Sequence, residues 1–284
     1  MTEDTLRRKH AALLEALAEP GSVLVAFSGG VDSTLVLHAA LEALPREKVL
    51  AVTATSVMHP AAEATEAVEL AESMEAPHKV IETQPLAAPD VAANPPTRCY
   101  HCKRLFFSDL QEMAADRGLA VVADGTTADD SNAYRPGMRA CAELGVLQPL
   151  NEAGLVKAEV RELSARLGLP TSQKPSAPCL ATRLPYGLDL TEERLRKVGA
   201  AEDLMRDLGF DRFRVRLVDD HTARIEVPLD RLALLCQSSL RSRIVDGFRA
   251  VGINYVTVDL AGLRSGSMDE ILPPEVLAEE EGQG

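Results

Sequence analysis

The feature of this sequence that most limits its fold is a loop of small residues, Ser28–Ser33 (SGGVDS), between two regular elements. The apolar run Val23–Phe27 before the loop predicts a buried strand, and the pattern of Asp32–Leu44 after it predicts a helix. In this order, backbone N–H groups and a helix N-terminus face one point where an anion can bind. The loop is therefore a candidate phosphate site. The alternative is a tight strand-to-helix turn capped by Ser28 or Asp32.

The residue types in and beside the loop suit phosphate contacts. Gly29 and Gly30 let the backbone approach phosphate oxygens without a Cβ clash. Ser28, Ser33 and Thr34 carry hydroxyl groups that can donate hydrogen bonds to the same oxygens. The six loop residues together suit phosphate contacts, and they lie between a predicted strand and a predicted helix near the N-terminus. Together these features favour phosphate binding over the simple turn.

Strands and helices are predicted to alternate over the first part of the chain. Strands are expected at Val23–Phe27, Val49–Ala54, Lys79–Glu82 and Ala120–Ala123, and helices at Leu6–Leu17, Asp32–Leu44, Pro60–Glu75, Tyr100–Arg117 and Lys157–Leu167. Such alternation predicts an α/β fold, a Rossmann-like doubly wound parallel sheet with helices on both faces. Between these elements, Thr83–Arg98 has four prolines and no periodicity, so we expect a loop there.

A second, smaller α+β unit is predicted in the C-terminal part. Its expected elements are a helix at Thr191–Leu208, paired strands at Phe213–Leu217 and Ala223–Val227, a helical stretch at Leu229–Val251 and a strand at Tyr255–Leu260. We place the nucleotide-binding domain at residues 1–185 and the second domain, for substrate or oligomerisation, at residues 186–284. The acidic end of the chain, Glu279–Gly284, is expected to be disordered.

Charge and composition favour a small substrate. The chain has 30 Lys and Arg against 43 Asp and Glu, a formal net charge of -13, which repels polyanions such as nucleic acid. Its first ten residues lack the apolar core of a signal peptide, and no apolar run is long enough to span a bilayer. We therefore expect a cytoplasmic protein with no membrane or nucleic-acid partner.

Two strand ends carry candidate nucleoside contacts. Thr53 lies in the polar stretch that ends the second predicted strand, and Gly125 follows a later one. In parallel sheets the carboxyl ends of the strands face the ligand. The alternative for both positions is an ordinary polar loop at the end of a strand.

The cysteines form a second candidate site. Cys99 and Cys102 make a CxxC at the start of a predicted helix, and Cys179 lies in a proline-flanked loop. Four interpretations compete: a redox pair, a zinc site completed by His101 or a distant residue, a 4Fe-4S cluster with one open iron, and ordinary thiols. The spacing alone does not separate zinc from the cluster.

With its loop after the first strand, the sequence resembles the PP-loop ATP pyrophosphatases, whose signature is SGGxDS. That family includes GMP synthetase, NAD synthetase, asparagine synthetase and tRNA thiolases. The resemblance implies cleavage of ATP between the α and β phosphates, with transfer of AMP. In such a reaction the loop and a Mg²⁺ ion stabilise the phosphates, and Asp32 is a candidate ligand of that ion.

Several further motifs resemble one family within this group, the LarE family. These motifs are Ser176–Gly187 (SAPCLATRLPYG), Arg135–Gly137, Arg214–Arg216, Ala223–Glu226 and Leu263–Gly266. The resemblance covers nearly the whole chain. It implies an ATP-dependent sulfur transferase that makes the nickel-pincer nucleotide cofactor, acting on a pyridinium dicarboxylate mononucleotide, and a homo-oligomer.

The resemblance also assigns roles to the cysteines. In one branch of the family a single cysteine, matching Cys179, gives up its own sulfur and becomes dehydroalanine. In the other branch three cysteines, matching Cys99, Cys102 and Cys179, hold a 4Fe-4S cluster that carries sulfide from a sulfide donor. This sequence has all three and fits the cluster branch. Cys141 and Cys236 lie outside the motifs, and we expect both to be free, buried thiols.

The same resemblance suggests substrate and metal contacts in the second domain. Arg183, Arg214 and Arg216 are candidates for holding the phosphate or carboxylates of the substrate, because a guanidinium forms paired hydrogen bonds with such anions. From the residues alone, the two strand arginines would be assigned to a solvated face. Glu202 and Glu226 match positions of a metal site.

Two other functions compete with sulfur transfer to a small molecule. Some PP-loop tRNA thiolases also use a CxxC and a third cysteine, although the net charge of -13 and the lack of a basic cluster argue against RNA. A non-catalytic nucleotide sensor would bind ATP at the loop but would leave the three cysteines without a role.

Overall fold

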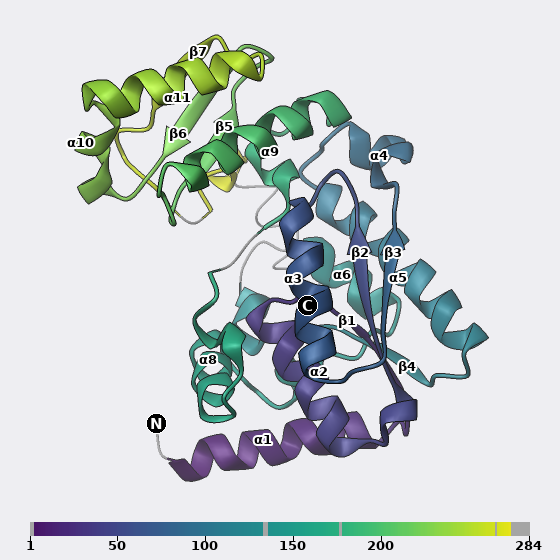
Figure 1. Cartoon of the computed structure of the whole chain (residues 1–284). Coiled ribbons are helices and arrows are strands. Elements are labelled where there is room, and N and C mark those ends of the chain that lie inside the picture. Colours follow the sequence, from purple (N-terminus) through teal and green to yellow (C-terminus); the bar gives the residue numbers. More distant parts are fainter. Residues whose placement is uncertain (1–2, 133–135, 176–177, 265, 274–284) are drawn as a thin grey trace. The chain divides into compact units, whose positions relative to one another are not determined.

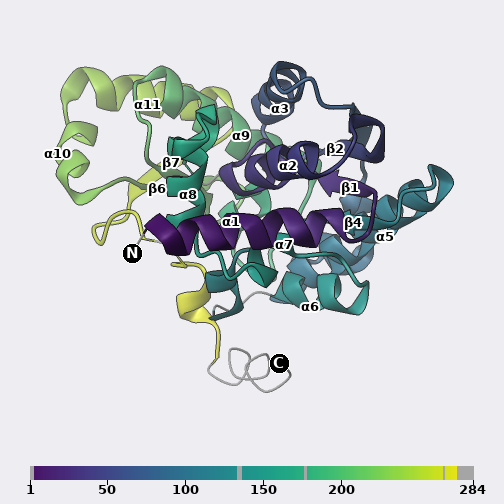
Figure 2. The ribbon, with the colours of Figure 1, turned by 90° about the horizontal axis from the view of Figure 1, so that it is seen from below.

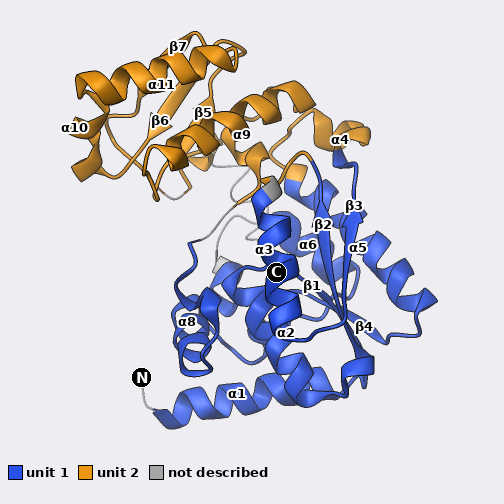
Figure 3. Ribbon diagram, viewed as in Figure 1, with its two compact units in different colours: residues 1–56, 61–85, 99–177 blue, residues 57–60, 86–98, 178–284 orange. Residues whose placement is uncertain are grey.

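The computed structural model describes residues 3–132, 136–175, 178–264 and 266–273. The chain divides into two compact units, drawn in separate colours in Figure 3. Unit 1 comprises residues 1–56, 61–85 and 99–177, and unit 2 comprises residues 57–60, 86–98 and 178–284. In this division the chain enters unit 2 for the last time at residue 178. Compact units are not necessarily independent domains, so the predicted domain boundary at residue 185 stays a prediction.

Unit 1 contains the predicted α/β fold. Its sheet has the strand order β3-β2-β1-β4, and all neighbouring strands are parallel (Figure 1). The strands are β1 (Val23–Ala26), β2 (Val49–Thr55), β3 (His78–Glu82) and β4 (Val121–Ala123). Strand β1 lies between β2 and β4. Its carboxyl end, where the loop begins, therefore has a neighbouring strand on each side.

Helices cover both faces of this sheet, as the alternating pattern predicts. They are α1 (Glu3–Ala18), α2 (Val31–Ala43), α3 (Ala61–Ser73), α5 (Arg98–Asp116), α6 (Pro136–Glu143), α7 (Pro149–Glu152) and α8 (Lys157–Arg166), with short 3-10 turns η1 (Arg46–Lys48), η3 (Ala128–Asn132) and η4 (Pro170–Gln173). Successive residues of β1 point to opposite faces. Val23 and Val25 join the core with α1 and α2, while Leu24 joins the core with α5. Helix α1 packs on α2, α7 and α8 (Figure 2).

The expectation of a continuous loop over Thr83–Arg98 is wrong. The segment contains a 3-10 turn, η2 (Pro85–Ala87), and a short helix, α4 (Pro89–Ala92), and α5 already starts at Arg98. Pro89 occupies the first turn of α4, where its missing N–H costs no hydrogen bond. The prolines therefore start helical turns here instead of excluding them.

Unit 2 has a three-stranded sheet of order β5-β6-β7. Besides α4, its elements are η5 (Leu180–Arg183), α9 (Glu192–Asp207), β5 (Arg214–Leu217), β6 (Thr222–Glu226), η6 (Leu229–Arg231), α10 (Leu232–Leu235), α11 (Ser238–Ala250), β7 (Tyr255–Val258) and η7 (Asp269–Ile271). The predicted hairpin is confirmed, since β5 and β6 are antiparallel; β7 is parallel to β6, which requires the helical crossover between them.

Two expectations about the C-terminal part have different outcomes. The single helical stretch expected over Leu229–Val251 is broken into η6, α10 and α11, with Cys236 ending α10 and Gln237 capping α11. The tail Glu279–Gly284 lies outside the described residues. None of the helices in the described ranges is both long and apolar enough to traverse a bilayer.

Candidate functional site

The loop Ser28–Ser33 connects β1 to α2 and is held by its own hydrogen bonds. Gly30 caps α2, and the Thr34 hydroxyl donates to the Gly30 carbonyl at 2.7 Å. The Ser33 Oγ accepts from the backbone N–H of Ser28 at 3.2 Å and lies 3.1 Å from the Ser28 Oγ. The loop is therefore a fixed structure around the N-terminus of a helix, which favours anion binding.

Two glycines permit close packing around this helix N-terminus. Gly29 has a φ of +67°, and a Cβ there would lie 3.1 Å from the Cβ of Ala67. A Cβ at Gly125 would lie 2.9 Å from the backbone nitrogen of Ser33. Gly125 thus has a packing role against α2, and its predicted contact with a nucleoside stays a prediction.

A pocket beside the loop is lined by three cations that the sequence analysis did not single out: Lys157, Arg161 and Lys174. Lys157 is the first residue of α8, where the positive end of the helix dipole disfavours a cation. A lysine at the first position of a helix therefore indicates that a negative charge lies nearby. Asp32, which also lines the pocket, supplies one.

Two of these cations shape the pocket wall. The Lys174 Nζ donates to the Gly29 carbonyl at 3.0 Å and pairs with the Glu66 carboxylate at 2.8 Å. The Arg161 guanidinium donates to the carbonyls of Ser172 and Lys174 at 2.8 and 2.9 Å. Arg161 therefore orders the segment that carries Lys174, and Lys174 in turn contacts the loop.

Asp32 has one oxygen in an ion pair and one that is available. Its Oδ2 contacts the Lys157 ammonium. Its Oδ1 is buried and has no hydrogen-bond partner among the described residues. Since a buried carboxylate oxygen is costly without a partner, this atom suits a cation at the pocket.

Thr53 is engaged within the protein. Its hydroxyl donates to the Phe27 carbonyl at 2.7 Å and lies 2.8 Å from the His78 Nε2. Partial burial lowers the pKa of His78, so its ring is neutral at physiological pH. Thr53 links β1, β2 and β3, and its predicted contact with a nucleoside stays a prediction.

Cys99 and Cys102 are the second and fifth residues of α5, and both side chains are partly exposed. Their spacing of three residues puts them on one face of the helix. They belong to unit 1, whereas Cys179 belongs to unit 2, so a joint site of the three stays a prediction. Within either unit, the described residues contain no group of three or more His, Cys, Asp or Glu side chains placed to hold a metal ion.

Cys141 is buried in a polar contact with α5 and β4. Its Sγ lies 3.6 Å from both the Lys103 Nζ and the Asp124 Oδ2, and the ammonium and carboxylate are 3.5 Å apart. Burial, which favours the neutral thiol, raises the pKa of Cys141 to about 11. The expectation of a buried thiol is confirmed for Cys141 but wrong for Cys236, which is exposed at the end of α10.

Cys179 precedes η5 in unit 2, and Arg183 ties this turn to α9. The Arg183 guanidinium donates to both oxygens of Glu202 at 2.8 and 3.1 Å, and both side chains are 5% exposed. A third donor of Arg183 reaches the Pro178 carbonyl at 3.1 Å, and Glu202 accepts from the Val215 N–H. This buried pair fixes the loop around Cys179 to α9 and β5.

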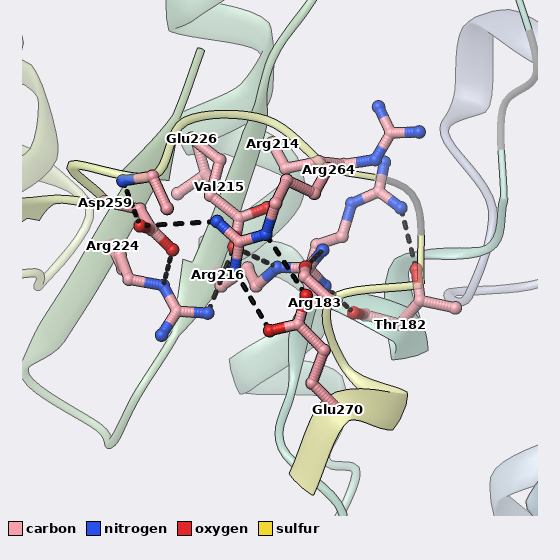
Figure 4. Close-up of polar contacts among 12 residues, drawn as sticks. Thr182, Arg183, Arg214, Val215, Arg216, Arg224, Glu226, Asp259, Arg264 and Glu270 are labelled. Carbon is pink, nitrogen blue, oxygen red and sulfur yellow. Dashed lines mark hydrogen bonds and ion pairs between the residues drawn. The ribbon is translucent and has the colours of Figure 1, made fainter. Parts of the chain in front are cut away.

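A second buried pair joins β5 and β6 (Figure 4). The Arg216 Nε donates to the Glu226 Oε1 at 2.5 Å, and Arg224 donates to the same oxygen at 3.0 Å. Arg216 also donates to the carbonyl of Thr182 at 2.7 Å. The Glu226 Oε2 is buried and has no hydrogen-bond partner among the described residues, so one oxygen of the predicted metal ligand is available.

Arg214 differs from the other two predicted substrate arginines. The hydrogen bond that its guanidinium makes is to the adjacent Phe213 carbonyl, at 2.8 Å. Burial and the neighbouring charge of Arg183 lower the pKa of Arg214. A guanidinium that is crowded by other cations and holds no carboxylate of its own among the described residues is suited to bind an anionic ligand.

Comparisons with known proteins agree with this geometry. The NAD synthase family model matches residues 8–94. A pyridinium-3,5-bisthiocarboxylic acid mononucleotide synthase of Lactiplantibacillus plantarum is 40% identical over 96% of this chain and 98% of its own length. An uncharacterized protein of Synechocystis is 39% identical over 94% of this chain and 99% of its own length. An NH(3)-dependent NAD(+) synthetase of Methanococcoides burtonii is 32% identical over 58% of this chain and 64% of its own length.

The parallel sheet, the loop at the carboxyl end of β1 and the NAD synthase match define an ATP-using enzyme of the PP-loop class. Identity over nearly the full length of both chains places it more narrowly. The chain belongs to the LarE family, that of the Lactiplantibacillus enzyme.

Replacing Lys174 by Met should weaken ATP binding on the order of tenfold, because the pocket loses a cation that contacts Gly29. Isothermal titration with ATP and Mg²⁺ measures this. Lys48→Met, on the exposed turn η1, is the matched control and should bind as the parent does. Equal affinity of the Lys174 and Lys48 variants would contradict the assignment.

Arg183 and Arg214 should separate stability from substrate binding. Arg183→Met leaves the buried carboxylate of Glu202 without its cation. The free energy of unfolding, measured with urea, should therefore fall by about 3–5 kcal/mol. Arg214→Met should lose much less stability but should raise the KM for the anionic substrate, with kcat less affected. The opposite pattern, a destabilised Arg214 variant and a stable Arg183 variant with a raised KM, would reverse the roles.

Iodoacetamide should distinguish Cys141 from Cys236. The thiolate is the reactive form, so a buried thiol with a pKa of about 11 reacts slowly at pH 8. Mass spectrometry of the native, reduced protein should show Cys236 modified well before Cys141, which should react only after unfolding or near pH 11. Cys236→Ser provides the control. Equal rates at the two sites in folded protein would contradict the described burial.

Proposed function

We propose that this chain adenylates a carboxylate of a pyridinium dicarboxylate mononucleotide with ATP and converts it to a thiocarboxylate, in the synthesis of a nickel-pincer nucleotide cofactor. The observation that carries this proposal is the PP-loop site in a chain that matches the Lactiplantibacillus synthase along nearly all of both sequences. The printed name of that relative specifies a bisthiocarboxylic acid mononucleotide as its product. A substrate of mononucleotide size carries few negative charges, so a chain with a net charge of -13 repels it less than it repels RNA.

The first step is attack of a substrate carboxylate oxygen on the α-phosphorus of ATP. A bond forms between that oxygen and phosphorus, the bond to the β-phosphate bridge breaks, and pyrophosphate leaves. The amides at the start of α2 hold the phosphates, and the hydroxyls of Ser28, Ser33 and Thr34 turn from the loop contacts that they make in the structure to donate to phosphate oxygens. Lys174 and Lys157 add positive charge at the pocket wall, which stabilises the departing pyrophosphate.

Magnesium fits this pocket at Asp32. The buried Oδ1 of that residue, which has no hydrogen-bond partner in the described structure, is a hard oxygen ligand of the kind that Mg²⁺ prefers. A bound Mg²⁺ would neutralise charge on the phosphates. The Lys157 ammonium contacts the other oxygen, Oδ2, so the cation can bind Oδ1 without displacing that lysine.

A 4Fe-4S cluster fits the chemistry of three of the five thiols. Cys99 and Cys102 are partly exposed on one face of a helix N-terminus, and Cys179 is partly exposed in its loop. Cys141 is buried and neutral, and Cys236 is an exposed thiol at the end of α10, outside the family motifs. When bound by Cys99, Cys102 and Cys179, such a cluster would supply an iron with an open position for sulfide.

The second step replaces AMP by sulfur at the activated carbonyl. A sulfide from an external donor forms a C–S bond to the acyl carbon, and the C–O bond to AMP breaks. Arg214 is proposed to hold the substrate phosphate or its second carboxylate, while Arg183 and Arg216 keep the loop around Cys179 in place. The proposed metal site at Glu202 and Glu226 has one available oxygen, the Glu226 Oε2. We further propose a cytoplasmic homo-oligomer.

An anaerobic assay with ATP, Mg²⁺, sulfide and the dicarboxylate mononucleotide should yield AMP, pyrophosphate and thiocarboxylate in equal amounts. Ser33→Ala and Gly30→Val should abolish all three products, because a donor is lost or the phosphate approach is blocked. Ser108→Ala, exposed on α5, is the control. ADP and inorganic phosphate as main products would contradict the proposed chemistry.

The same assay on cysteine variants tests the sulfur source. Cys99→Ala, Cys102→Ala and Cys179→Ala should each lose iron, labile sulfide and sulfur transfer together, while ATP binding at the loop survives. Conversion of Cys179 to dehydroalanine in protein that never held iron would instead establish the sacrificial route. Stabilisation of the protein by tRNA alone at physiological salt would favour the tRNA thiolase function.

A further inference from the structure

The segment before the CxxC contains a buried asparagine in an unusual backbone conformation. Asn94 is 0% exposed and has a φ of 51°, in the left-handed region that glycine and asparagine tolerate best. Its Nδ2 donates to the carbonyls of Pro185 and Leu188 at 2.8 and 3.1 Å. Its own carbonyl accepts from the Gly187 N–H at 2.9 Å. One residue thus binds three positions in the segment that follows Cys179.

Arg98 continues this contact at the first turn of α5. The residue is 2% exposed, and its Nη1 donates to the Asn94 Oδ1 and, at 3.2 Å, to the Ala181 carbonyl. Its guanidinium carbon lies 5.9 Å from the centroid of the Tyr186 ring, within the range of a cation–π contact. Cys99 follows Arg98 directly in the chain, and Ala181 lies two residues after Cys179.

Residues 178–190 need such partners because they form little regular structure of their own. Their one helical element is the short turn η5. Backbone groups in such a segment must be paired elsewhere. The Leu190 N–H donates to the Ala92 carbonyl at 2.7 Å, and the Leu180 N–H donates to the Met58 carbonyl at 2.8 Å. All of these residues belong to unit 2.

We propose that Asn94 and Arg98 are positioning residues for sulfur transfer: they form a clamp that fixes the segment leading into Cys99 to the loop carrying Cys179. The inference rests on the proposed function, in which Cys99, Cys102 and Cys179 act together. If residues 94 and 98 only filled space in the core, apolar side chains would serve. Here a buried guanidinium and a buried amide instead make directional hydrogen bonds to the carbonyls of one loop, which sets the position of that loop.

Hydrogen exchange in the reduced, metal-free protein tests the clamp directly. Arg98→Met keeps the aliphatic stem and removes the donors, and Asn94→Gly keeps the backbone conformation and removes the amide. Both variants should raise amide exchange in residues 178–190 about tenfold, since each loses buried hydrogen bonds. Arg212→Met, exposed in unit 2, is the control and should exchange as the parent does.

Function is measured on the same variants after anaerobic loading with iron and sulfide. Arg98→Met and Asn94→Gly should lose bound iron, visible absorbance and sulfur transfer, while thermal stabilisation by ATP and Mg²⁺ stays at the parent level. Unchanged exchange in residues 178–190 would overturn the clamp. Faster exchange with iron content and sulfur transfer intact would overturn its positioning role.

The two proposals fail in different ways. If the parent protein takes up no iron, the cluster part of the proposed function fails. The clamp is then supported if exchange in residues 178–190 rises and sulfur transfer from Cys179 falls in both variants, and it is overturned if either quantity stays at the parent value.

Discussion

The phosphate site depends on a close approach of backbone to backbone around the N-terminus of α2. A Cβ at Gly125 would lie 2.9 Å from the Ser33 nitrogen, and one at Gly29 would lie 3.1 Å from the Cβ of Ala67. The segment after β4 and helix α3 therefore close on the loop from two directions. Because the first amides of a helix have no partner within it, they remain available to an anion at the pocket. The Ser33 and Thr34 hydroxyls hold the loop in this shape.

In unit 2 the corresponding constraint is the pairing of buried charges. A buried ion pair adds little net stability, but breaking it is costly, so it fixes geometry more than it stabilises the fold. Arg183 and Arg216 each hold a buried glutamate and use a further donor on a carbonyl near Cys179. Among the described residues the Arg214 guanidinium has no such carboxylate partner, and its hydrogen bond goes to the Phe213 carbonyl. The two buried pairs therefore fix the surroundings of the residue that we propose as the anion contact.

The sequence predicted features that follow from local pattern and missed those that depend on tertiary partners. The strand, loop and helix around Ser28–Ser33 were predictable because apolar runs and small residues determine them locally. The pairing of Arg183 with Glu202 was not, since an isolated surface-type carboxylate gives no sign of its partner. Lys174 was missed for the same reason. Its contact with the Gly29 carbonyl and its place in the pocket lining show that it belongs to the phosphate pocket.

The thiols show how environment, not residue type, divides their roles. Cys141 lies next to a lysine, which by itself would favour a thiolate, yet burial and Asp124 outweigh that cation and keep it neutral. Lys103 is one residue from Cys102, so its ammonium could have served the CxxC, but Asp124 and Cys141 engage it instead. Cys99 and Cys102, the second and fifth residues of α5, are partly exposed, whereas Cys141 is buried. Exposure therefore separates these two thiols from Cys141: a reagent or ligand can reach them, while the Cys141 thiol stays enclosed.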